Sequence, residues 1–225
     1  MIISVVIPVI RRELFLQLWE DFKRQSMRIS QAVIIDNAQC LDVTELQDAP
    51  FSVLLLTPAR NISVNPAWNI GLRLSTECDV VALLNDDVRI SREFIKKSVR
   101  ALGLYPEAGV VCPLTEPASK AEELNNIPQP NHPIARMTKR EGWAMVIDGD
   151  LLLRIPPIPE TLRTFCGDDW IWYWSHRLHR CWMKDMANII HHHVGASMAV
   201  LPEIRKTMKA EKTEFTRIIK ELDAQ

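Results

Sequence analysis

The sequence has few cysteines, and they follow no pattern. They are odd in number and widely scattered, and no two form a CxxC pair; they are Cys40, Cys78, Cys112, Cys166 and Cys181. This spacing argues against a disulfide framework and against a zinc ribbon. It favours a reducing compartment, so we expect a cytoplasmic location.

The sequence also lacks an excess of charge of one sign and a long apolar run. Lys and Arg number 27 against 28 Asp and Glu, a formal net charge of −1. This balance gives no general indication of binding to nucleic acid or to an anionic membrane. No apolar stretch approaches the length of a membrane span. Residues 1–8 lack the basic region of a signal peptide and are interpreted as a first strand. We therefore expect no integral membrane segment.

Glycine is scarce, with 7 residues in 225. A nucleotidyltransferase on a similar sheet would need a glycine-rich phosphate loop after the first strand. The residues at that place are Val9, Ile10, Arg11 and Arg12, so the sequence does not favour a nucleotidyltransferase. The sequence has no GxSxG motif and no paired Cys and His motif, so a covalent nucleophile is not indicated.

Apolar strands alternate with amphipathic helices in the first half of the chain. Strands are predicted at residues 2–7, 31–36, 51–56, 79–84 and 109–112, and helices at 12–25, 65–75 and 91–104. Pro8 is expected to end the first strand, while Asn65 and Ser91 are expected to cap helices. This alternation predicts an α/β fold with a mostly parallel sheet flanked by helices. Residues 1–113 are interpreted as a nucleotide-binding half.

The rest of the chain has a different character. Residues 114–200 form the second half in this interpretation, and residues 114–138, rich in proline and polar residues, are interpreted as a flexible loop near the site. An inert surface loop is the alternative. A strand is predicted at 142–148, a helix from Asp168 that includes Trp170 and Trp182, and a strand at 186–191. Residues 201–225 are predicted to form a closing helix.

The strand predicted at 79–84 ends in Asn85, Asp86 and Asp87. Adjacent carboxylates at the end of a buried strand repel each other and are costly to desolvate. A divalent cation removes both problems, because oxygen ligands suit Mg²⁺ and Mn²⁺. The carboxyl ends of strands are also where open α/β sheets bind ligands. A metal–diphosphate site is therefore predicted, with a solvated acidic turn as the alternative.

Seven short motifs occur in an order that resembles inverting GT-A glycosyltransferases of family 2. The resemblance covers residues 2–197 and is greatest to small bacterial and phage-type members, including rhamnosyltransferase-like sequences. It implies a GT-A fold with a Rossmann-like sheet and a C-terminal acceptor half. The motifs lie at residues 4–8, 33–37, 69–71, 84–87, 142–145, 167–170 and 190–197.

The resemblance implies a set of donor-binding residues. Asp36 would accept a hydrogen bond from the nucleobase, which suits an acceptor-only carboxylate. An Asx-type turn is the alternative for Asp36, and close helix packing is the alternative for Gly71. The residues implied in donor binding are Pro8, Asp36, Asn69, Asn85 and Asp86.

The resemblance also implies a metal site for Mn²⁺ or Mg²⁺. Asp87 would bind the cation and bridge it to the diphosphate, with His193 and next His191 as the imidazole ligands. Imidazole suits Mn²⁺ better than Mg²⁺. Asn85 stands where the family has an acidic residue, so it can hydrogen-bond a ribose hydroxyl but supplies no charge. A structural histidine is the alternative for each imidazole.

Catalysis would rest on the acidic pair at the start of the predicted helix. The resemblance implies that Asp169 is the general base, with Asp168 beside it; the alternative is that one of the two is the helix N-cap. Trp143 and Trp170 are candidates for stacking on an acceptor sugar. A role in the core is the alternative, especially for Trp170, which lies in the predicted helix.

The expected activity is metal-dependent transfer of a sugar, with inversion, from a UDP-sugar to an acceptor hydroxyl. The acceptor is a saccharide, a lipid-linked sugar or a hydroxymethylated base of phage DNA. The alternative is a nucleotide-sugar-binding protein without activity. The sequence does not determine the oligomeric state. A DNA acceptor would require a basic face, for which the candidates are Arg136, Lys139, Arg140, Arg163, Arg177, Arg180 and Lys184.

Overall fold

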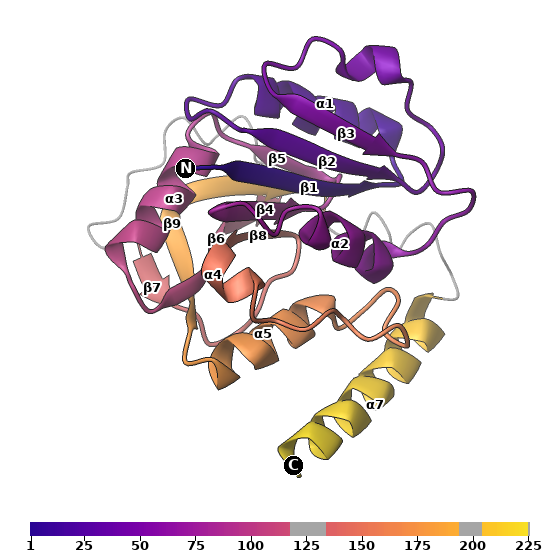
Figure 1. Ribbon diagram of the computed structural model, residues 1–225, viewed down its shortest axis with the longest axis vertical. Coiled ribbons are helices and arrows are strands. Elements are labelled where there is room, and N and C mark those ends of the chain that lie inside the picture. Colours follow the sequence, from indigo (N-terminus) through magenta and orange to yellow (C-terminus); the bar gives the residue numbers. More distant parts are fainter. Residues whose placement is uncertain (118–133, 194–203, 225) are drawn as a thin grey trace.

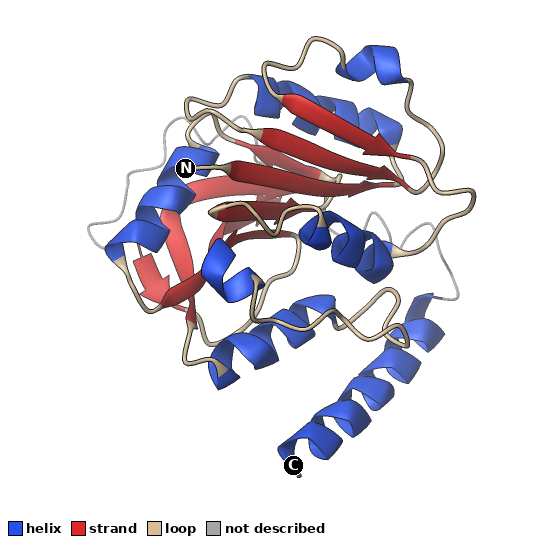
Figure 2. Cartoon of the chain, in the orientation of Figure 1, coloured by secondary structure: helices blue, strands red, loops and turns tan. Residues whose placement is uncertain are grey.

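The computed structural model describes residues 1–117, 134–193 and 204–224, and these build one central sheet with helices on both faces (Figures 1 and 2). The helices are α1 (Arg12–Lys23), η1 (Val43–Leu46, a 3₁₀ helix), α2 (Val64–Arg73), α3 (Phe94–Leu104), α4 (Gly149–Leu152), α5 (Gly167–Arg177) and α7 (Ile204–Asp223). The strands are β1 (Ile3–Val9), β2 (Gln31–Asp36), β3 (Ser52–Leu56), β4 (Val80–Leu84), β5 (Val88–Ile90), β6 (Ala108–Pro117), β7 (Ile134–Arg136), β8 (Ala144–Asp148) and β9 (Cys181–His192).

The sheet is parallel in its first half and mixed in its second. Its order is β3-β2-β1-β4-β8-β6-β9-β5, and β7 pairs with β9. The pairings of β1 with β2 and β4, of β2 with β3 and of β6 with β9 are parallel. Strand β8 runs antiparallel to both β4 and β6, because it starts at the edge where β4 ends. The α/β class is confirmed, while the parallel character is confined to fewer strands than the sequence predicts.

Alternating side chains of the strands supply two separate cores. On one face Val5, Ile7 and Val9 of β1 pack with residues of α1 and α3. On the other face Val6 packs with residues of α2, α4 and α5, and apolar residues of α7 pack against the same cluster. This is the two-residue period of a strand that is buried on both sides.

Several element boundaries differ from the prediction. Strand β1 continues through Pro8, because pairing with β4 ends at Val6 and a missing N–H at Pro8 costs no hydrogen bond to β4. Helix α3 has Glu93 rather than Ser91 as its N-cap, and Asn65 lies inside α2 rather than capping it. Trp182 belongs to β9, not to the helix before it.

The second half also departs from the prediction at its loop. Residues 114–117 continue β6, and residues 134–136 form β7, so two ends of the predicted loop are strands. Residues 137–138 are irregular, and residues 118–133 lie outside the described residues. Within the described ranges, none of the helices combines the length and apolar character required to cross a bilayer.

Helix α2 approaches β1 closely at a glycine. A Cβ added to Gly71 would lie 2.1 Å from Cγ1 of Val6, a fully buried side chain of the central strand. The close-packing interpretation of Gly71 is therefore confirmed. Gly103 of α3 provides the contrast, since a Cβ added there has no neighbour within 4 Å.

We expect Gly71→Ala to destabilise the fold by about 1–3 kcal/mol, because the new methyl group forces β1 and α2 apart. Gly103→Ala should leave stability unchanged or raise it by up to about 1 kcal/mol, because alanine favours a helix. Urea unfolding of both variants measures the difference. Equal stability of the two variants would contradict the close packing seen here.

Candidate active site

Four strand ends meet at one edge of the sheet, which is the carboxyl edge of β1 and β4. Antiparallel pairing of β4 with β8 sets Leu84 opposite Ala144, so the residues after β4 and before β8 are neighbours. The backbone N–H of Asn85 donates to the carbonyl of Trp143 at 2.9 Å. Strand β9 ends at the same edge, where the N–H of His193 donates to the carbonyl of Asp87 at 3.0 Å.

Asp86 ties the end of β4 to the loop after β1. Its Oδ2 accepts hydrogen bonds from the backbone N–H groups of Ile10 and Arg11, both at 2.8 Å, and its Oδ1 pairs with the guanidinium of Arg11. Burial raises the pKa of Asp86 above its ordinary value, and the opposing effect of Arg11 does not cancel this. Both carboxylate oxygens are engaged within the protein, so the observed role of Asp86 is structural. Its predicted part in donor binding stays a prediction.

Asp87 is buried beside two cationic or ionisable groups. Its Oδ2 lies 3.1 Å from Nη1 of Arg11 and 3.3 Å from Nε2 of His192. Burial acts to raise the pKa of Asp87, but the hydrogen bond from His192 and the charge of Arg11 together hold it below the ordinary value. Its Oδ1 is buried and accepts no hydrogen bond from the part of the chain that the structure describes.

The imidazole next to Asp87 belongs to His192, not to the predicted His193 or His191. His193 meets Asp87 only through its backbone N–H, and His191 lies opposite Arg89 in the β5–β9 ladder. Successive side chains of a strand point to opposite faces. Either His192 or the pair His191 and His193 can therefore face Asp87, but not all three. The register that selects His192 comes from its pairing with Val88.

Trp143 lies against this pair. Its ring stacks on His192 with centroids 4.9 Å apart and planes 15° from parallel, and its indole N–H donates to Oγ1 of Thr115 at 2.8 Å. Trp170, by contrast, is 4% exposed in the core and donates to the carbonyl of Pro156. Trp170 is therefore a core residue, and the acceptor role stays a prediction for Trp143 alone.

Asp168 and Asp169 occupy the first turn of α5. The N-cap is Cys166, in a left-handed conformation with φ of 62°, and neither aspartate caps the helix. A Cβ on Gly142 would lie 2.8 Å from Cβ of Asp168, so the residue before Trp143 packs directly on the acidic turn. Burial raises the pKa of Asp168, against the smaller opposing effect of Arg140.

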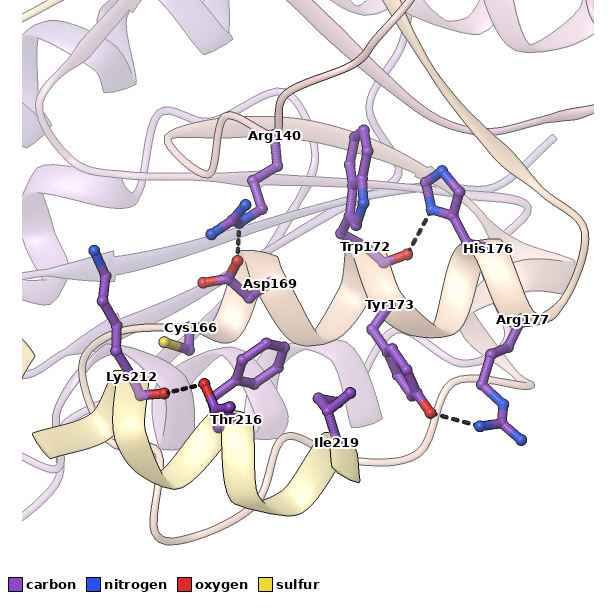
Figure 3. Close-up of a pocket in the computed structure, with 11 residues that line it drawn as sticks. Arg140, Cys166, Asp169, Trp172, Tyr173, His176, Arg177, Lys212, Thr216 and Ile219 are labelled. Carbon is purple, nitrogen blue, oxygen red and sulfur yellow. Dashed lines mark hydrogen bonds and ion pairs between the residues drawn. The ribbon is translucent and has the colours of Figure 1, made fainter. Parts of the chain in front are cut away.

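Asp169 faces a pocket between α5 and α7. Its Oδ1 pairs with Nε of Arg140, and the pocket that both residues line has a volume of about 750 Å³ (Figure 3). Residues 142–143 lie between the first turn of α5 and the Asp87 cluster, by which we mean Asp87 with Arg11 and His192. Gly142 packs on Asp168, and Trp143 stacks on His192. The two predicted acidic centres are thus neighbours across one short segment of chain.

Other predicted donor residues hold local structure. Asp36 accepts from the N–H groups of Cys40 at 3.1 Å and Leu41 at 2.9 Å, so it holds the loop after β2, but through residues four and five positions on rather than through the two-residue spacing of an Asx turn. Asn69 exchanges two hydrogen bonds with the backbone of Ile158, at 2.8 and 2.9 Å. Pro8 is buried in β1, and Asn85 is partly buried beside Asp86. Nucleotide contacts of these residues stay predictions.

Three residues of the site have no role in it predicted from the sequence: Arg11, His192 and Arg140. Arg11 was visible as a basic residue directly after the first strand, and two buried aspartates at the neighbouring strand end require a cation. Arg140 is predicted only as part of a DNA-binding basic face, and its pairing with Asp169 of α5 cannot be predicted because it depends on the fold.

Asp87 and His192 could supply two of the ligands of a divalent cation. The described residues contain no group of three or more His, Cys, Asp or Glu side chains arranged to hold a metal. Asp87 nevertheless presents a buried Oδ1 without a hydrogen-bond donor, next to an imidazole. One carboxylate and one imidazole fit a cation that takes its remaining ligands from a diphosphate and water.

Comparison with known proteins bears on the fold. A scan against family models and a search of curated proteins find no match. Among solved structures, GalNAc-T7 with UDP, GalNAc and Mn²⁺ superposes with a TM-score of 0.68 over 85% of this chain, at 12% identity. TarS 1–349 from S. aureus with UDP-GlcNAc gives 0.65 over 89%, at 14% identity. The chain has the GT-A glycosyltransferase fold.

A third neighbour agrees with this fold. The mannosyltransferase PcManGT from Pyrobaculum calidifontis, with GDP-Man and Mn²⁺, gives a TM-score of 0.62 over 83% of this chain, at 16% identity. The chain spans only part of these relatives, namely 43% of GalNAc-T7, 61% of the TarS fragment and 56% of PcManGT. The shared fold covers nearly all of this chain but only about half of theirs.

We expect Arg11→Gln to destabilise the protein by about 3–5 kcal/mol, because it leaves two buried carboxylates without their cation. Arg12→Gln is the matched control, since the neighbouring Arg12 pairs with Glu45 at the surface and should contribute little. Chemical unfolding at pH 7 checks both. A similar decrease in the free energy of unfolding for the two variants would contradict a large stabilising contribution of Arg11.

The stability of the protein should depend on Asp87 in a pH-dependent way. Because its pKa is lower in the folded state, its stabilising effect is present above the unfolded value of about 4 and is lost as the pH falls through the folded value. Asp87→Asn should therefore cost about 1–3 kcal/mol at pH 7 in metal-free buffer, and the difference from wild type should shrink in acid.

The exposed Asp150 of α4 provides the control. Asp150→Asn should follow the wild-type stability curve throughout the titration. A deficit for Asp87→Asn that persists or grows in acid would contradict the direction of its pKa shift.

Proposed function

We propose that this chain is a glycosyltransferase. It would move a sugar from a nucleoside-diphosphate donor to an acceptor hydroxyl, with inversion at the anomeric carbon, as family 2 enzymes do. The observation that carries the proposal is the unsatisfied Oδ1 of Asp87 at the carboxyl edge of β4, with Asp169 facing a pocket on the other side of residues 142–143. Residues 1–113 would form the donor half and residues 114–200 the acceptor half.

The ligands bound in the structural neighbours support the choice of donor. UDP or UDP-GlcNAc is bound to GalNAc-T7 and TarS, and GDP-Man is bound to PcManGT. We expect a UDP-sugar first and a GDP-sugar second. GalNAc-T7 and PcManGT also carry Mn²⁺, which supports a divalent cation at Asp87 and His192 of this chain.

Asp169 would act as the general base. The proton of the acceptor hydroxyl passes to its carboxylate, the oxygen forms a bond with C1 of the sugar, and the bond from C1 to the diphosphate breaks with its electron pair on the diphosphate. Asp169 must first leave its ion pair with Arg140. A base held within hydrogen-bond reach of the hydroxyl contributes about 10²–10⁴-fold to such a reaction.

Arg11 and Asp87 would prepare the leaving-group side. The guanidinium of Arg11 and the imidazole of His192 both contact Oδ2 of Asp87, which fixes the carboxylate and leaves its Oδ1 available. A bound Mn²⁺ or Mg²⁺ would supply Lewis-acid neutralisation of charge on the departing diphosphate. Trp143 would keep the His192 ring in place by stacking.

The test is nucleotide release from UDP-, GDP- and dTDP-sugars, with and without Mn²⁺. Asp169→Asn should lower turnover by about 10²–10⁴-fold while donor affinity stays unchanged, since the base does not touch the donor. Asp150→Asn should match wild type. Product anomers resolved by NMR should show inversion.

A separate measurement tests the metal site without activity. Mn²⁺ binding followed by electron paramagnetic resonance in the presence of UDP should be weakened by Asp87→Asn and by His192→Gln, and not by His193→Gln. If no nucleotide sugar is bound or turned over by the wild-type protein, the proposed function is wrong.

A further inference from the structure

The pocket at Asp169 is built by a helix that lies outside the sheet. Helix α7 packs apolar side chains against the cluster that includes α5, and two carboxylates fasten it, one in its middle and one at its C-terminal end. Glu211, 6% exposed, accepts from the backbone N–H groups of Thr164 at 2.9 Å and Phe165 at 2.6 Å. Asp223 accepts from the hydroxyl of Tyr173 at 2.6 Å. The two contacts hold α7 against α5 and the loop before it, and the groove between α5 and α7 is shown in Figure 3.

The groove has the size and surface of a small-molecule site. Its volume of about 750 Å³ falls in the range of such pockets, which are mainly apolar and aromatic with a few polar groups that fix orientation. Trp172 and Tyr173 contribute the aromatic surface. Such surfaces suit a sugar, which presents apolar C–H faces and polar hydroxyls.

The charge of the groove is positive. Among the described residues that line it, Arg140, Arg177 and Lys212 are cationic, whereas Asp169 is the one carboxylate. Arg177 is already paired with Asp223 at 3.0 Å. Nζ of Lys212 makes no hydrogen bond or ion pair with the described part of the chain, and its side chain extends toward the end of the groove where Arg140 meets Asp169 (Figure 3).

We propose that the groove between α5 and α7 binds an acceptor sugar that carries an anionic group, recognised by Lys212 and Arg140. This inference rests on the proposed transferase function and names the acceptor class. The anion gives Arg140 a new partner and thereby releases the carboxylate of Asp169. The freed carboxylate then accepts the proton of the acceptor hydroxyl, whereas a neutral sugar leaves the Arg140–Asp169 pair intact.

A saccharide fits the observations better than a nucleic acid. Several basic residues that could form a DNA-binding face are paired with acidic neighbours, including Arg180 with Asp148 and Lys184 with Glu141. Their charge is therefore neutralised by ion pairs within the protein. The free positive charge of the groove is concentrated at Lys212, which suits one anionic group rather than a phosphate backbone.

The experiment measures binding in the absence of donor. Methyl glucoside, methyl glucuronide and glucose 6-phosphate are titrated into ¹⁵N-labelled protein, and the indole signal of Trp172, assigned with Trp172→Phe, is followed. The carboxylate and phosphate sugars distinguish the two sources of the anion. Inorganic phosphate and a short DNA oligonucleotide are titrated in parallel.

At least one anionic sugar should bind more tightly than the neutral glucoside. Lys212→Gln should weaken that binding about tenfold, the effect of one charge-assisted hydrogen bond, and leave the glucoside unchanged. Lys220→Gln is the control, because it makes the same change on α7 at an exposed residue that does not line the groove.

Three results would overturn the inference. These are equal binding of neutral and anionic sugars, no effect of Lys212→Gln, and binding of phosphate or DNA that is as tight as that of the anionic sugar. The proposed function fails separately. Donor turnover with a neutral acceptor and no effect of Lys212→Gln keeps the function and removes the inference. Anionic-sugar binding without any donor binding keeps the anionic-sugar site in the groove but removes both the function and the role of that sugar as acceptor.

Discussion

The contact of Arg11 with Asp86 and Asp87 is the constraint on which the rest of the site depends. Two adjacent carboxylates, 2% and 3% exposed, would repel each other in a medium that screens charge poorly. One guanidinium reaches both, and two backbone N–H groups complete the shell of Asp86. The same contacts fix the loop after β1 to the end of β4. Stability and the direction of the Asp87 carboxylate therefore come from a single arrangement.

The reversal of β8 brings the second part of the site to the first. Because β8 starts where β4 ends, Gly142 and Trp143 lie between the Asp87 cluster and the acidic turn of α5. The missing side chain of Gly142 admits Asp168, and the large side chain of Trp143 covers His192. Two neighbouring residues of opposite size thus set the separation of two charged centres. A parallel strand at this position would carry these residues to the other edge of the sheet.

The sequence predicts most of the longer strands and helices, because buried apolar runs and helical periodicity are local properties, but it does not predict β5, β7 or α4. It does not predict which histidine faces Asp87, since that depends on the pairing of β5 with β9, made by residues about a hundred positions apart. The same limit explains the ion pair of Arg140 with Asp169 and the core position of Trp170. A local structural role for Asp36 can be predicted, because its partners lie within five residues, although they are not those of an Asx turn.

Helix α7 can vary in sequence independently of the β1–β4 edge. The helix contributes no strand to the sheet and meets the body through Glu211, Asp223 and an apolar face. Under the proposed function the groove side of α7 receives the acceptor, so substitutions there would alter which acceptors bind while the β1–β4 edge stays the same. Exchange of this one helix would then be a direct way to redesign acceptor specificity.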